Sequence, residues 1–451
     1  MEIILVGVGK IGSAVTASLA AEGHNVCVID IDPKKVNEVA ERYDVMGICG
    51  NGAIYGTQLE AGAQKADLLI AATASDELNI LCCLVAKKIG VMHTIARVRD
   101  PEYAAQLDMI TDFGVSLTVN PDYDAAGEIS RVLRFPSVNH VDSFFNGRVE
   151  LVGVRVKKES EMVGLSLQDI SRKYRSKVLL CAVQRGDEVF IPRGSFVLRE
   201  DDLIHISGQR NDLSSFIKEL GQYKQRIRTV LLAGGGRIGY YLSRLLDDSG
   251  MAVKLMEKVP AKCESLAASL SDTGITVVCG DGSSQEELSV QGIAVQDAFV
   301  ALTDNDEQNI VMSMYAQASG AKKVVAKVNR FPSELLNTFG LDSVISSRSV
   351  TTDKIVAFVR SLQSAGRGGI RSLSRPLGGK IEAIEFGAAE GDRCLSVPFK
   401  ELTLLPDLLV AAILRKNKVI HPRGDDTIEA GDRVIVVTKQ TTLTRLDDIL
   451  V

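Results

Sequence analysis

The fold of this chain is decided by its first residues, Met1-Glu-Ile-Ile-Leu-Val-Gly7-Val8-Gly9-Lys10-Ile11-Gly12. The apolar run from Ile3 to Val6 predicts a buried parallel strand, and it passes directly into the pattern G-x-G-x-x-G. In such a turn the first glycine allows a tight bend, the second lets the backbone approach a pyrophosphate, and the third lets the next helix pack on the sheet. The helix predicted from Ser13 to Glu22 would direct its first N–H groups at the phosphates.

An acidic residue stands where such a nucleotide-binding unit needs one. Asp30 follows the apolar strand Val26 to Ile29, eighteen positions after Gly12. A carboxylate there can accept hydrogen bonds from both hydroxyls of an adenosine ribose and would repel a 2′-phosphate. The pattern therefore favours NAD or an ATP-like ligand over NADP. A glycine turn without any ligand is the less favoured interpretation.

The same motif occurs a second time. Gly234-Gly235-Gly236-Arg237-Ile238-Gly239 lies 227 positions after the first motif, and Glu257 lies 227 positions after Asp30. An internal repeat of this length predicts a duplicated architecture. Three further matches at an offset of 230 are Gly50-Asn51-Gly52 with Gly280-Asp281-Gly282, Ala71 to Asn79 with Ala301 to Asn309, and Ala96-Arg97-Val98 with Ala326-Lys327-Val328.

Composition narrows the class of protein. The 451 residues are 45% hydrophobic and 24% charged, which is typical of a soluble globular protein with ample core. A net charge of −5 without a basic block argues against nucleic acid as a partner. No apolar run approaches the roughly 18 residues that span a bilayer, and no signal peptide is recognised, so we expect a cytoplasmic protein. The eight cysteines lack C-x-x-C spacing and are predicted to be small buried hydrophobes.

Strands and helices alternate as far as about residue 120, which predicts an open parallel sheet with helices on both faces. From about His140 the pattern changes to short alternating strands with two helices, as in a small α+β domain. The polar linker Tyr223 to Arg228 leads into the second half, and Ser364 to Ser374 is predicted to be a flexible connector. The fold class is therefore α/β, with two Rossmann-like parallel-sheet domains, each followed by a small α+β domain. The predicted boundaries are 1–135, 136–224, 225–363 and 364–451.

Two further positions are candidates for ligand contact. The predicted strand Leu68 to Ala72 runs into Thr73-Ala74-Ser75-Asp76, at the edge where doubly wound sheets bind ligands. Thr73 could meet a ribose or a phosphate, while Ser75 and Asp76 fit a plain helix cap equally well. Arg97 lies in an otherwise apolar strand and is costly to bury unpaired. A dinucleotide phosphate fits it, and a structural salt bridge is the alternative.

The sequence offers little for catalysis. None of the five histidines, His24, His93, His140, His205 and His421, is predicted at a strand's carboxyl end beside the ligand, and His140 and His421 are expected in turns. Small domains of roughly 80 residues also leave little room for a substrate cleft. A lysine or tyrosine catalyst stays open, but a binding protein is the better interpretation. No catalytic and no metal-binding residue is predicted.

The order and spacing of these motifs, over essentially the whole chain, resemble the TrkA family. Its members are cytosolic nucleotide-binding subunits of bacterial Trk potassium uptake systems, built from two tandem RCK (KTN) units. The resemblance implies binding of NAD(H), ATP or ADP. It also implies a homo-oligomeric ring, as a tetramer, beneath a membrane-embedded potassium transporter subunit at the inner face of the membrane.

The resemblance also implies which residues bind the nucleotide. In the first half they are Gly7, Val8, Gly9, Lys10, Ile11 and Gly12 for the pyrophosphate, Asp30 for the ribose, Thr73 and Ala74 for the middle of the ligand, and Arg97 for a phosphate. In the second half they are Gly234, Gly235, Gly236, Arg237, Ile238, Gly239, Glu257, Thr303, Asp304 and Lys327. Asp304 in place of Ala74 sets a carboxylate near the expected phosphate, and Lys327 cannot pair a phosphate as bidentately as Arg97. The second site is therefore expected to bind a different ligand, or to bind weakly.

The mechanism that follows is gating by a ligand. A nucleotide that prefers one ring geometry shifts the ring's population, with a coupling of about 1–3 kcal/mol per effector. Two rival hypotheses are a NAD-dependent dehydrogenase and a free-standing nucleotide sensor without a channel.

Overall fold

The computed structural model describes residues 1–104, 106–138, 140–174, 177–221, 225–331, 340–341, 343–363 and 369–451. Contacts divide the chain into two compact units. The first comprises Met1–Ala126, Gly236–Tyr241 and Ser346–Val356, and the second comprises Gly127–Gly235, Leu242–Ile345 and Ala357–Val451.

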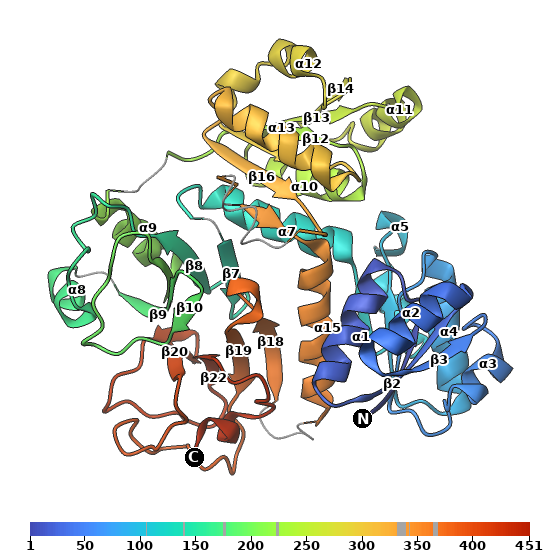
Figure 1. Cartoon of the computed structure of the whole chain (residues 1–451), viewed down its shortest axis with the longest axis horizontal. Coiled ribbons are helices and arrows are strands. Elements are labelled where there is room, and N and C mark those ends of the chain that lie inside the picture. The colour runs from blue at the N-terminus through green and yellow to red at the C-terminus, as the bar shows by residue number, and fades with distance from the viewer. Residues whose placement is uncertain are drawn as a thin grey trace. The chain divides into compact units, whose positions relative to one another are not determined.

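The first unit is built on a six-stranded sheet with strand order β3-β2-β1-β4-β5-β6, in which the strand pairs are parallel. Its strands are β1 (Glu2–Val6), β2 (Asn25–Asp30), β3 (Met46–Cys49), β4 (Leu68–Ala71), β5 (His93–Arg97) and β6 (Leu117–Val119). Its helices are α1 (Lys10–Ala21), α2 (Pro33–Tyr43), α3 (Tyr55–Glu60), α4 (Asp76–Ile89), α5 (Pro101–Ala104), α6 (Leu107–Asp112) and the start of α7 (Pro121–Arg134). Figure 1 shows α1 to α4, in blue, around this sheet. The predicted doubly wound arrangement is confirmed.

Local sequence explains most of these elements. The strands β1 and β4 are apolar and almost entirely buried, as expected for the centre of a parallel sheet. The helix α2 begins with Pro33 in its first turn, and the side chain of Asp32 caps it by accepting a hydrogen bond from the Lys34 amide. The helix α4 is capped at its C-terminus by Gly90, which has φ +119°.

Two segments from later in the chain complete the first unit. The helix α15 (Ser347–Gln363) contributes its first turns, and its Lys354 forms an ion pair of 3.1 Å with Asp124 of α7. The first turns of α10 (Arg237–Asp247) contribute Tyr241, whose hydroxyl donates a hydrogen bond of 2.9 Å to the Arg99 carbonyl.

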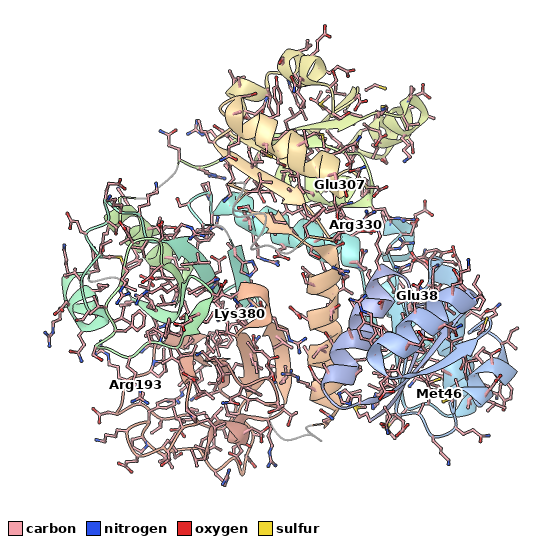
Figure 2. The ribbon with its side chains drawn as sticks, in the orientation of Figure 1. Glu38, Met46, Arg193, Glu307, Arg330 and Lys380 are labelled. Carbon is pink, nitrogen blue, oxygen red and sulfur yellow. The ribbon has the colours of Figure 1, made fainter. Side chains whose placement is uncertain are left out.

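The second unit contains the second Rossmann-like sheet, with strand order β14-β13-β12-β15-β16-β17. Its strands are β12 (Thr229–Ala233), β13 (Ala252–Glu257), β14 (Thr276–Cys279), β15 (Ala298–Ala301), β16 (Lys323–Lys327) and β17 (Val344–Ile345). Its helical segments include α11 (Pro260–Ser269), α12 (Gln285–Val290), η1 (Ile293–Val295) and α13 (Asp306–Ala318), which lies along β16 in Figure 1. The strand order repeats that of the first sheet strand for strand. Arg330, after β16, forms an ion pair of 3.7 Å with Glu307 of α13; both are labelled in Figure 2.

The second unit also holds two small antiparallel sheets with the same topology, β10-β9-β11-β8-β7 and β18-β19-β22-β20-β21. The first consists of β7 (His140–Phe144), β8 (Val149–Arg155), β9 (Val178–Arg185), β10 (Glu188–Phe190) and β11 (Leu203–Gly208). The second consists of β18 (Ile370–Ser374), β19 (Glu382–Gly387), β20 (Leu408–Arg415), β21 (Lys418–Ile420) and β22 (Arg433–Thr438). The accompanying helical segments are α8 (Leu167–Lys173), α9 (Arg210–Glu219), η2 (Leu377–Gly379) and η3 (Leu446–Ile449).

Two sequence predictions fail in the small sheets. The span Ser364 to Ser374 is not a plain connector, because Ile370–Ser374 forms β18; residues 364–368 lie outside the described residues. His140 is not in a turn, because it begins β7. Burial would lower the pKa of the His140 imidazole, but the carboxylates of Asp142, at 2.8 Å, and Glu128, at 3.6 Å, outweigh burial and raise it to about 9.

The two small sheets share one apolar core. It contains Phe144, Phe145, Val149, Leu151, Cys181, Ala182 and Val189 from the first sheet region, and Ile381, Ala383, Ala411, Ala412, Leu414, Ile435 and Val437 from the second. At its edge, Lys380, labelled in Figure 2, donates a hydrogen bond of 3.0 Å to the Asp187 carbonyl. Because one cluster draws side chains from both sheets, neither sheet buries its inner face alone.

A buried ion pair anchors the end of α15 to the last small sheet. Arg360 is 1% exposed and Glu382 0% exposed, with hydrogen bonds of 2.7 and 2.9 Å between them. Arg375 also contacts Glu382 at 3.0 Å, and the Thr441 carbonyl accepts from Arg360 at 2.7 Å. A bidentate pair of this kind offsets much of the cost of removing both charges from water.

The cysteine prediction holds for six residues and is wrong for two. Cys27, Cys82, Cys83, Cys181, Cys263 and Cys394 are buried, and burial raises the pKa of the Cys27 thiol to about 11. Cys49 and Cys279 are exposed, because each ends an edge strand of its sheet. Among the described residues, no helix has both the length and the apolar character needed to cross a bilayer.

Candidate functional site

The glycine-rich loop after β1 has the geometry that its sequence predicts. Gly7 has φ +93°, and a Cβ there would lie 2.8 Å from the Thr73 amide nitrogen, so only glycine fits this tight approach to the end of β4. A Cβ on Gly12 would lie 1.9 Å from the Gly7 carbonyl oxygen. A Cβ on Gly9 would meet nothing within 4 Å, which leaves open space over the loop. Lys10, Ile11 and Gly12 form the first turn of α1.

The carboxylate of Asp30 fixes the glycine-rich loop by hydrogen bonding. Its two carboxylate oxygens accept hydrogen bonds from the amides of Val8, at 2.8 Å, and Asp32, at 3.0 Å. The carboxylate therefore fixes the loop that follows β1 and the turn that follows β2 at the same time. Each oxygen keeps a further lone pair, so the same group can still accept hydrogen bonds from a ligand hydroxyl.

Thr73 is fixed by Asn79, one turn into α4. The Asn79 side-chain oxygen accepts from both the amide and the hydroxyl of Thr73, each at 2.7 Å, and its Nδ2 donates to the Arg97 carbonyl at 2.9 Å. Asn79 is fully buried. One amide side chain thus joins the carboxyl ends of β4 and β5, which the sequence predicted only to lie at the same edge.

Arg97 lies at this edge without a carboxylate partner among the described residues. Its guanidinium donates to the Thr73 carbonyl, while its Nε is buried without a hydrogen-bond partner. Burial, and then the positive charge of Arg99, lower the pKa of this guanidinium to about 10. The neighbouring carboxylate of Asp76 instead accepts from the amides of Arg99 and Asp100. The predicted salt-bridge alternative for Arg97 is therefore not found within the described ion pairs.

Ser75 and Ala74 have structural roles. The Ser75 hydroxyl accepts from the Leu78 amide at 3.1 Å, which makes it the N-cap of α4 as expected. The Ala74 carbonyl accepts a hydrogen bond of 2.6 Å from the Arg99 guanidinium.

The second half repeats this framework. Glu257 accepts from the amides of Gly235, at 3.0 Å, and Val259, at 2.9 Å, as Asp30 does in the first half. Asn309 accepts from the Thr303 amide at 2.9 Å and hydroxyl at 2.7 Å, and donates to the Lys327 carbonyl at 2.9 Å. Gly234 has φ +122°, and Gly236 again leaves open space. Arg237, Ile238 and Gly239 form the first turn of α10.

The charges differ between the halves. The Lys327 ammonium lies 3.4 Å from the carboxylate of Asp304, where the first half has Arg97 and Ala74. Lys258 likewise pairs with Asp281 at 2.7 Å, where the first half has Ile31 and Asn51. Both lysines therefore have a carboxylate of the protein as an ion-pair partner.

Sequence analysis missed the residues that position this edge. The sequence predicts no role for Asn79, Asn309 or Asp306, and for Asp76 it predicts only a candidate helix cap. Asp306 accepts from the amides of Asn329 and Arg330, each at 2.9 Å, as Asp76 does for Arg99 and Asp100. Their identity at an offset of 230 was the available signal, because short polar side chains kept in both copies at a strand end commonly bond the backbone.

Both halves of the chain match known protein families. The TrkA-N domain family matches residues 3–121 and 230–347, and the TrkA-C domain family matches residues 151–221 and 384–451. The chain belongs to the TrkA family. A Trk system potassium uptake protein TrkA homolog of Archaeoglobus fulgidus is 31% identical over 451 residues, which covers 100% of both chains. The Trk system potassium uptake protein TrkA of Halomonas elongata is 31% identical, over 97% of this chain and 95% of its own.

Solved structures share the fold of this TrkA-family chain. The GsuK RCK domain has a TM-score of 0.62 at 18% identity, covering 97% of this chain and 92% of its own. The GsuK channel bound to NAD has a TM-score of 0.61 at 18% identity, covering 97% and 76%. Two Rossmann-type sheets, each followed by a small antiparallel sheet, are thus the tandem TrkA arrangement. The curated relatives are named as proteins of Trk potassium uptake systems.

Proposed function

We propose that this chain is the nucleotide-binding subunit that gates a membrane-embedded Trk-type potassium transporter. It binds NAD(H), with ATP and ADP as further ligands, at the carboxyl edge of the first Rossmann sheet. It works as a homo-oligomeric ring, a tetramer, in the cytoplasm at the inner face of the membrane. The names of its relatives support the potassium system, and the likeness to the GsuK channel bound to NAD supports the ligand.

The observation that carries the nucleotide site is the partly buried guanidinium of Arg97, whose Nε is buried without a hydrogen-bond partner. A cation with an unmet buried donor favours an anion, and a phosphate presents the oxygens that a guanidinium pairs best. The open space over Gly9 and the first turn of α1 lie at the same carboxyl edge, after β1 of the same sheet. Backbone amides at a helix N-terminus favour negative charge there as well. In this arrangement Gly7 to Gly12 contact the pyrophosphate, Asp30 the ribose, and Thr73 and Ala74 the middle of the ligand.

The second site binds the same ligands more weakly. Gly234 to Gly239, Glu257 and Thr303 offer the same framework, but Lys327 is held by Asp304. A phosphate must displace or tolerate that carboxylate, which adds repulsion at close range.

Calorimetric titration of the full chain with NADH, NADPH, ATP and ADP tests the site. Arg97→Gln and Asp30→Ala should each weaken the tighter binding event, and Glu257→Ala should affect only the weaker one. NADPH should bind at least tenfold more weakly than NADH, since Asp30 repels the added phosphate. If NADH binds wild type and Arg97→Gln equally well, the assignment of Arg97 to a phosphate is wrong.

Gating needs a ligand with different affinities for two ring geometries, because equal affinity shifts no equilibrium. Potassium flux into vesicles that contain the transporter subunit, with and without this chain and nucleotide, measures that difference. A flux that responds to nucleotide with wild type but not with Arg97→Gln supports gating. A flux that ignores nucleotide at saturation contradicts it.

Exposed apolar side chains support assembly. In the second Rossmann-like domain Val290, Val295, Val311 and Met314 are exposed on α12, η1 and α13, and in the first Ile54, Tyr55 and Leu81 are exposed at the corresponding α3 and α4. Apolar side chains gathered on equivalent helices mark protein–protein contact surfaces. We also propose that the domain boundaries lie at 1–135, 136–224, 225–363 and 364–451.

A further inference from the structure

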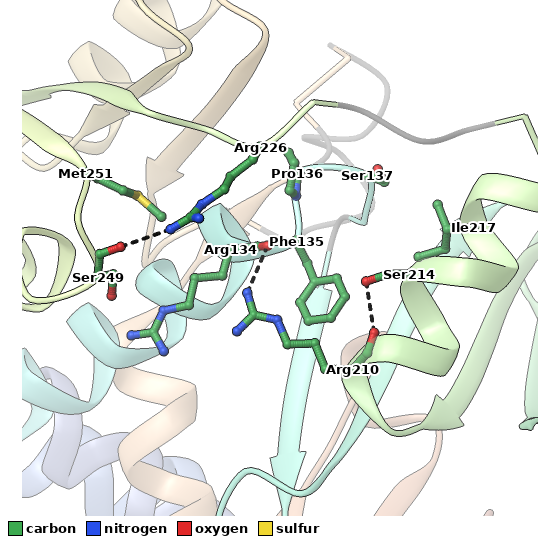
Figure 3. Close-up of a pocket in the computed structure, with 10 residues that line it drawn as sticks. All are labelled: Arg134, Phe135, Pro136, Ser137, Arg210, Ser214, Ile217, Arg226, Ser249 and Met251. Atoms are coloured by element: carbon green, nitrogen blue, oxygen red, sulfur yellow. Dashed lines mark hydrogen bonds between the residues drawn. The ribbon is translucent and has the colours of Figure 1, made fainter.

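A cavity of about 470 Å³ lies within the second unit, and neither glycine-rich loop contributes to its lining. It is bordered by the end of α7, by α9, by the segment before β12 and by the turn between α10 and β13 (Figure 3). Its size falls within the range of pockets that bind small molecules, roughly 300–1,000 Å³.

Three arginines from three separate segments line this cavity. Arg134 ends α7, Arg210 begins α9, and Arg226 precedes β12; Figure 3 shows their guanidinium groups around one space. Within the described residues none of them has a carboxylate within 4.0 Å, and none of the residues that border the cavity is acidic. Three cations that converge on a cavity with no acidic residue in its lining raise the local potential and favour a negatively charged ligand.

The arginines are held in place by neutral partners. Arg210 donates to the Arg134 carbonyl at 3.3 Å and lies over the Phe135 ring, 5.0 Å from its centroid. Arg226 donates to the Ser249 carbonyl at 3.2 Å. Each guanidinium has five N–H donors, so most of them stay available to a ligand.

Arg134 shows a buried donor that no protein atom meets. Its Nη2 donates to the Ser130 hydroxyl at 2.9 Å, but its Nε is buried without a hydrogen-bond partner. Burial, and then the charges of Arg210 and Arg131, lower the pKa of this guanidinium. Glu150 offsets part of the charge from outside the cavity, and its own Oε2 is also buried without a partner. An orphaned buried donor of this kind calls for an acceptor that the chain does not supply.

The remaining wall is apolar. Phe135 and Ile217 are buried side chains, and Met251 lies opposite them across the cavity. Guanidinium groups and apolar side chains that line one cavity suit a ligand with a charged part and a less polar part.

We propose that this cavity binds a small phosphorylated molecule, with its phosphate oxygens held by Arg134, Arg210 and Arg226. The site is separate from the two Rossmann sites and does not depend on them. Its ligand is a nucleotide if the apolar wall contributes to affinity, and a polyphosphate if the arginines act alone. Because the cavity is bordered by the first small domain and the second Rossmann-like domain, an occupant contacts both.

The test is calorimetric titration of the full chain with pyrophosphate, ATP and NADH. The variant is Arg210→Gln/Arg226→Gln, which removes two exposed side chains and should melt like wild type. Arg226→Gln alone serves as a second variant. Arg244→Gln is the matched control, because Arg244 is an exposed arginine paired with Asp272 at 3.4 Å and lies outside the cavity. Arg97→Gln marks the first Rossmann site.

Pyrophosphate should bind wild type, Arg97→Gln and Arg244→Gln alike, and the double variant at least about tenfold more weakly, as expected from losing hydrogen bonds to a charged group. Raising the salt concentration should weaken this binding. NADH should lose affinity in Arg97→Gln and keep its tighter binding event in the double variant. ATP that loses more affinity than pyrophosphate identifies a nucleotide ligand, and equal losses identify a polyphosphate. The proposal is overturned if pyrophosphate and ATP bind the double variant as well as wild type, or if neither binds the cavity of the wild type.

Discussion

Two alanine substitutions in the first glycine-rich loop should separate ligand binding from folding. Gly9 has φ −70° and ψ −165°, a conformation that alanine adopts freely, and its added Cβ would meet no atom within 4 Å. Gly12 lies inside α1, and its added Cβ would lie 1.9 Å from the Gly7 carbonyl oxygen. The first change fills space reserved for a ligand, and the second collides with the protein itself.

The sizes of the two effects follow from the contacts. Restoring ordinary contact at Gly12→Ala requires α1 and the Gly7 carbonyl to separate by about 1.5 Å. Overpacking of this kind costs about 1–3 kcal/mol, and the upper end applies because the obstacle is backbone. The helix propensity of alanine returns at most about 1 kcal/mol. The net loss of about 1–2 kcal/mol corresponds to a fall in Tm of about 2–8 °C.

Gly9→Ala should weaken ligand binding without lowering the stability of the fold. Its Tm should stay level or rise slightly, since replacing glycine at a compatible position lowers the entropy of the unfolded chain. NADH affinity should fall at least tenfold, because a methyl group then stands where the pyrophosphate approaches. Thermal unfolding and calorimetry on both variants, with Gly236→Ala as the matched change in the second half, measure this. The reasoning is refuted if Gly9→Ala binds NADH like wild type, or if Gly12→Ala melts at the wild-type temperature.

Four further outcomes are expected. Arg360→Met should lower the free energy of unfolding, measured by urea titration, by about 3–5 kcal/mol, because it leaves the charge of Glu382 buried without its main partner. The double variant Arg360→Met/Glu382→Met should recover most of that loss. A double variant as unstable as the single one would contradict this explanation. The stability that the protonated His140 contributes should be complete below about pH 6.5 and should disappear as the pH rises through about 9. The Tm values of wild type and His140→Gln should therefore converge over that interval. A difference in Tm that does not change with pH would contradict this prediction. Val311→Glu should dissociate the oligomer, as measured by sedimentation velocity, because it places a charge on the exposed apolar surface of α13. The Tm should not fall, since the side chain is exposed. An unchanged sedimentation coefficient would show that α13 is not part of the interface. Asp304→Ala should raise the affinity of the second nucleotide site by freeing the lysine that it pairs, and unchanged calorimetry there would show that this carboxylate is not what weakens binding.

Elements whose signal is local were predicted well. The strand β1 and the bend at Gly7 depend on a few neighbouring residues, and the structure has both. The repeat then transferred each prediction to the second half. The strands β7 and β18 were missed because they carry polar and glycine-flanked residues and gain strand structure only by pairing with β8 and β19.

The sequence predicted where the candidate site residues lie but not which side chains they contact. It placed Asp30, Thr73 and Arg97 at one edge of the sheet, and in the structure they lie at the ends of β2, β4 and β5. It gave no sign that Asn79 joins Thr73 to β5, or that Lys327 is paired with Asp304, because both depend on which side chains face each other after folding. The buried partner of Arg360 was hidden for the same reason.

The shared core of the two small sheets bears on how this chain arose. A protein with one copy of the repeat would leave Phe144, Leu151 and Ala182 facing water, so it would have to form an obligate twofold dimer to bury them. The tandem chain is the covalent form of that dimer, in which a linker replaces the concentration dependence of association. Once joined, the two copies no longer share one gene sequence and can diverge. Arg97 and Ala74 in one half, against the Lys327–Asp304 ion pair in the other, are a difference of this kind.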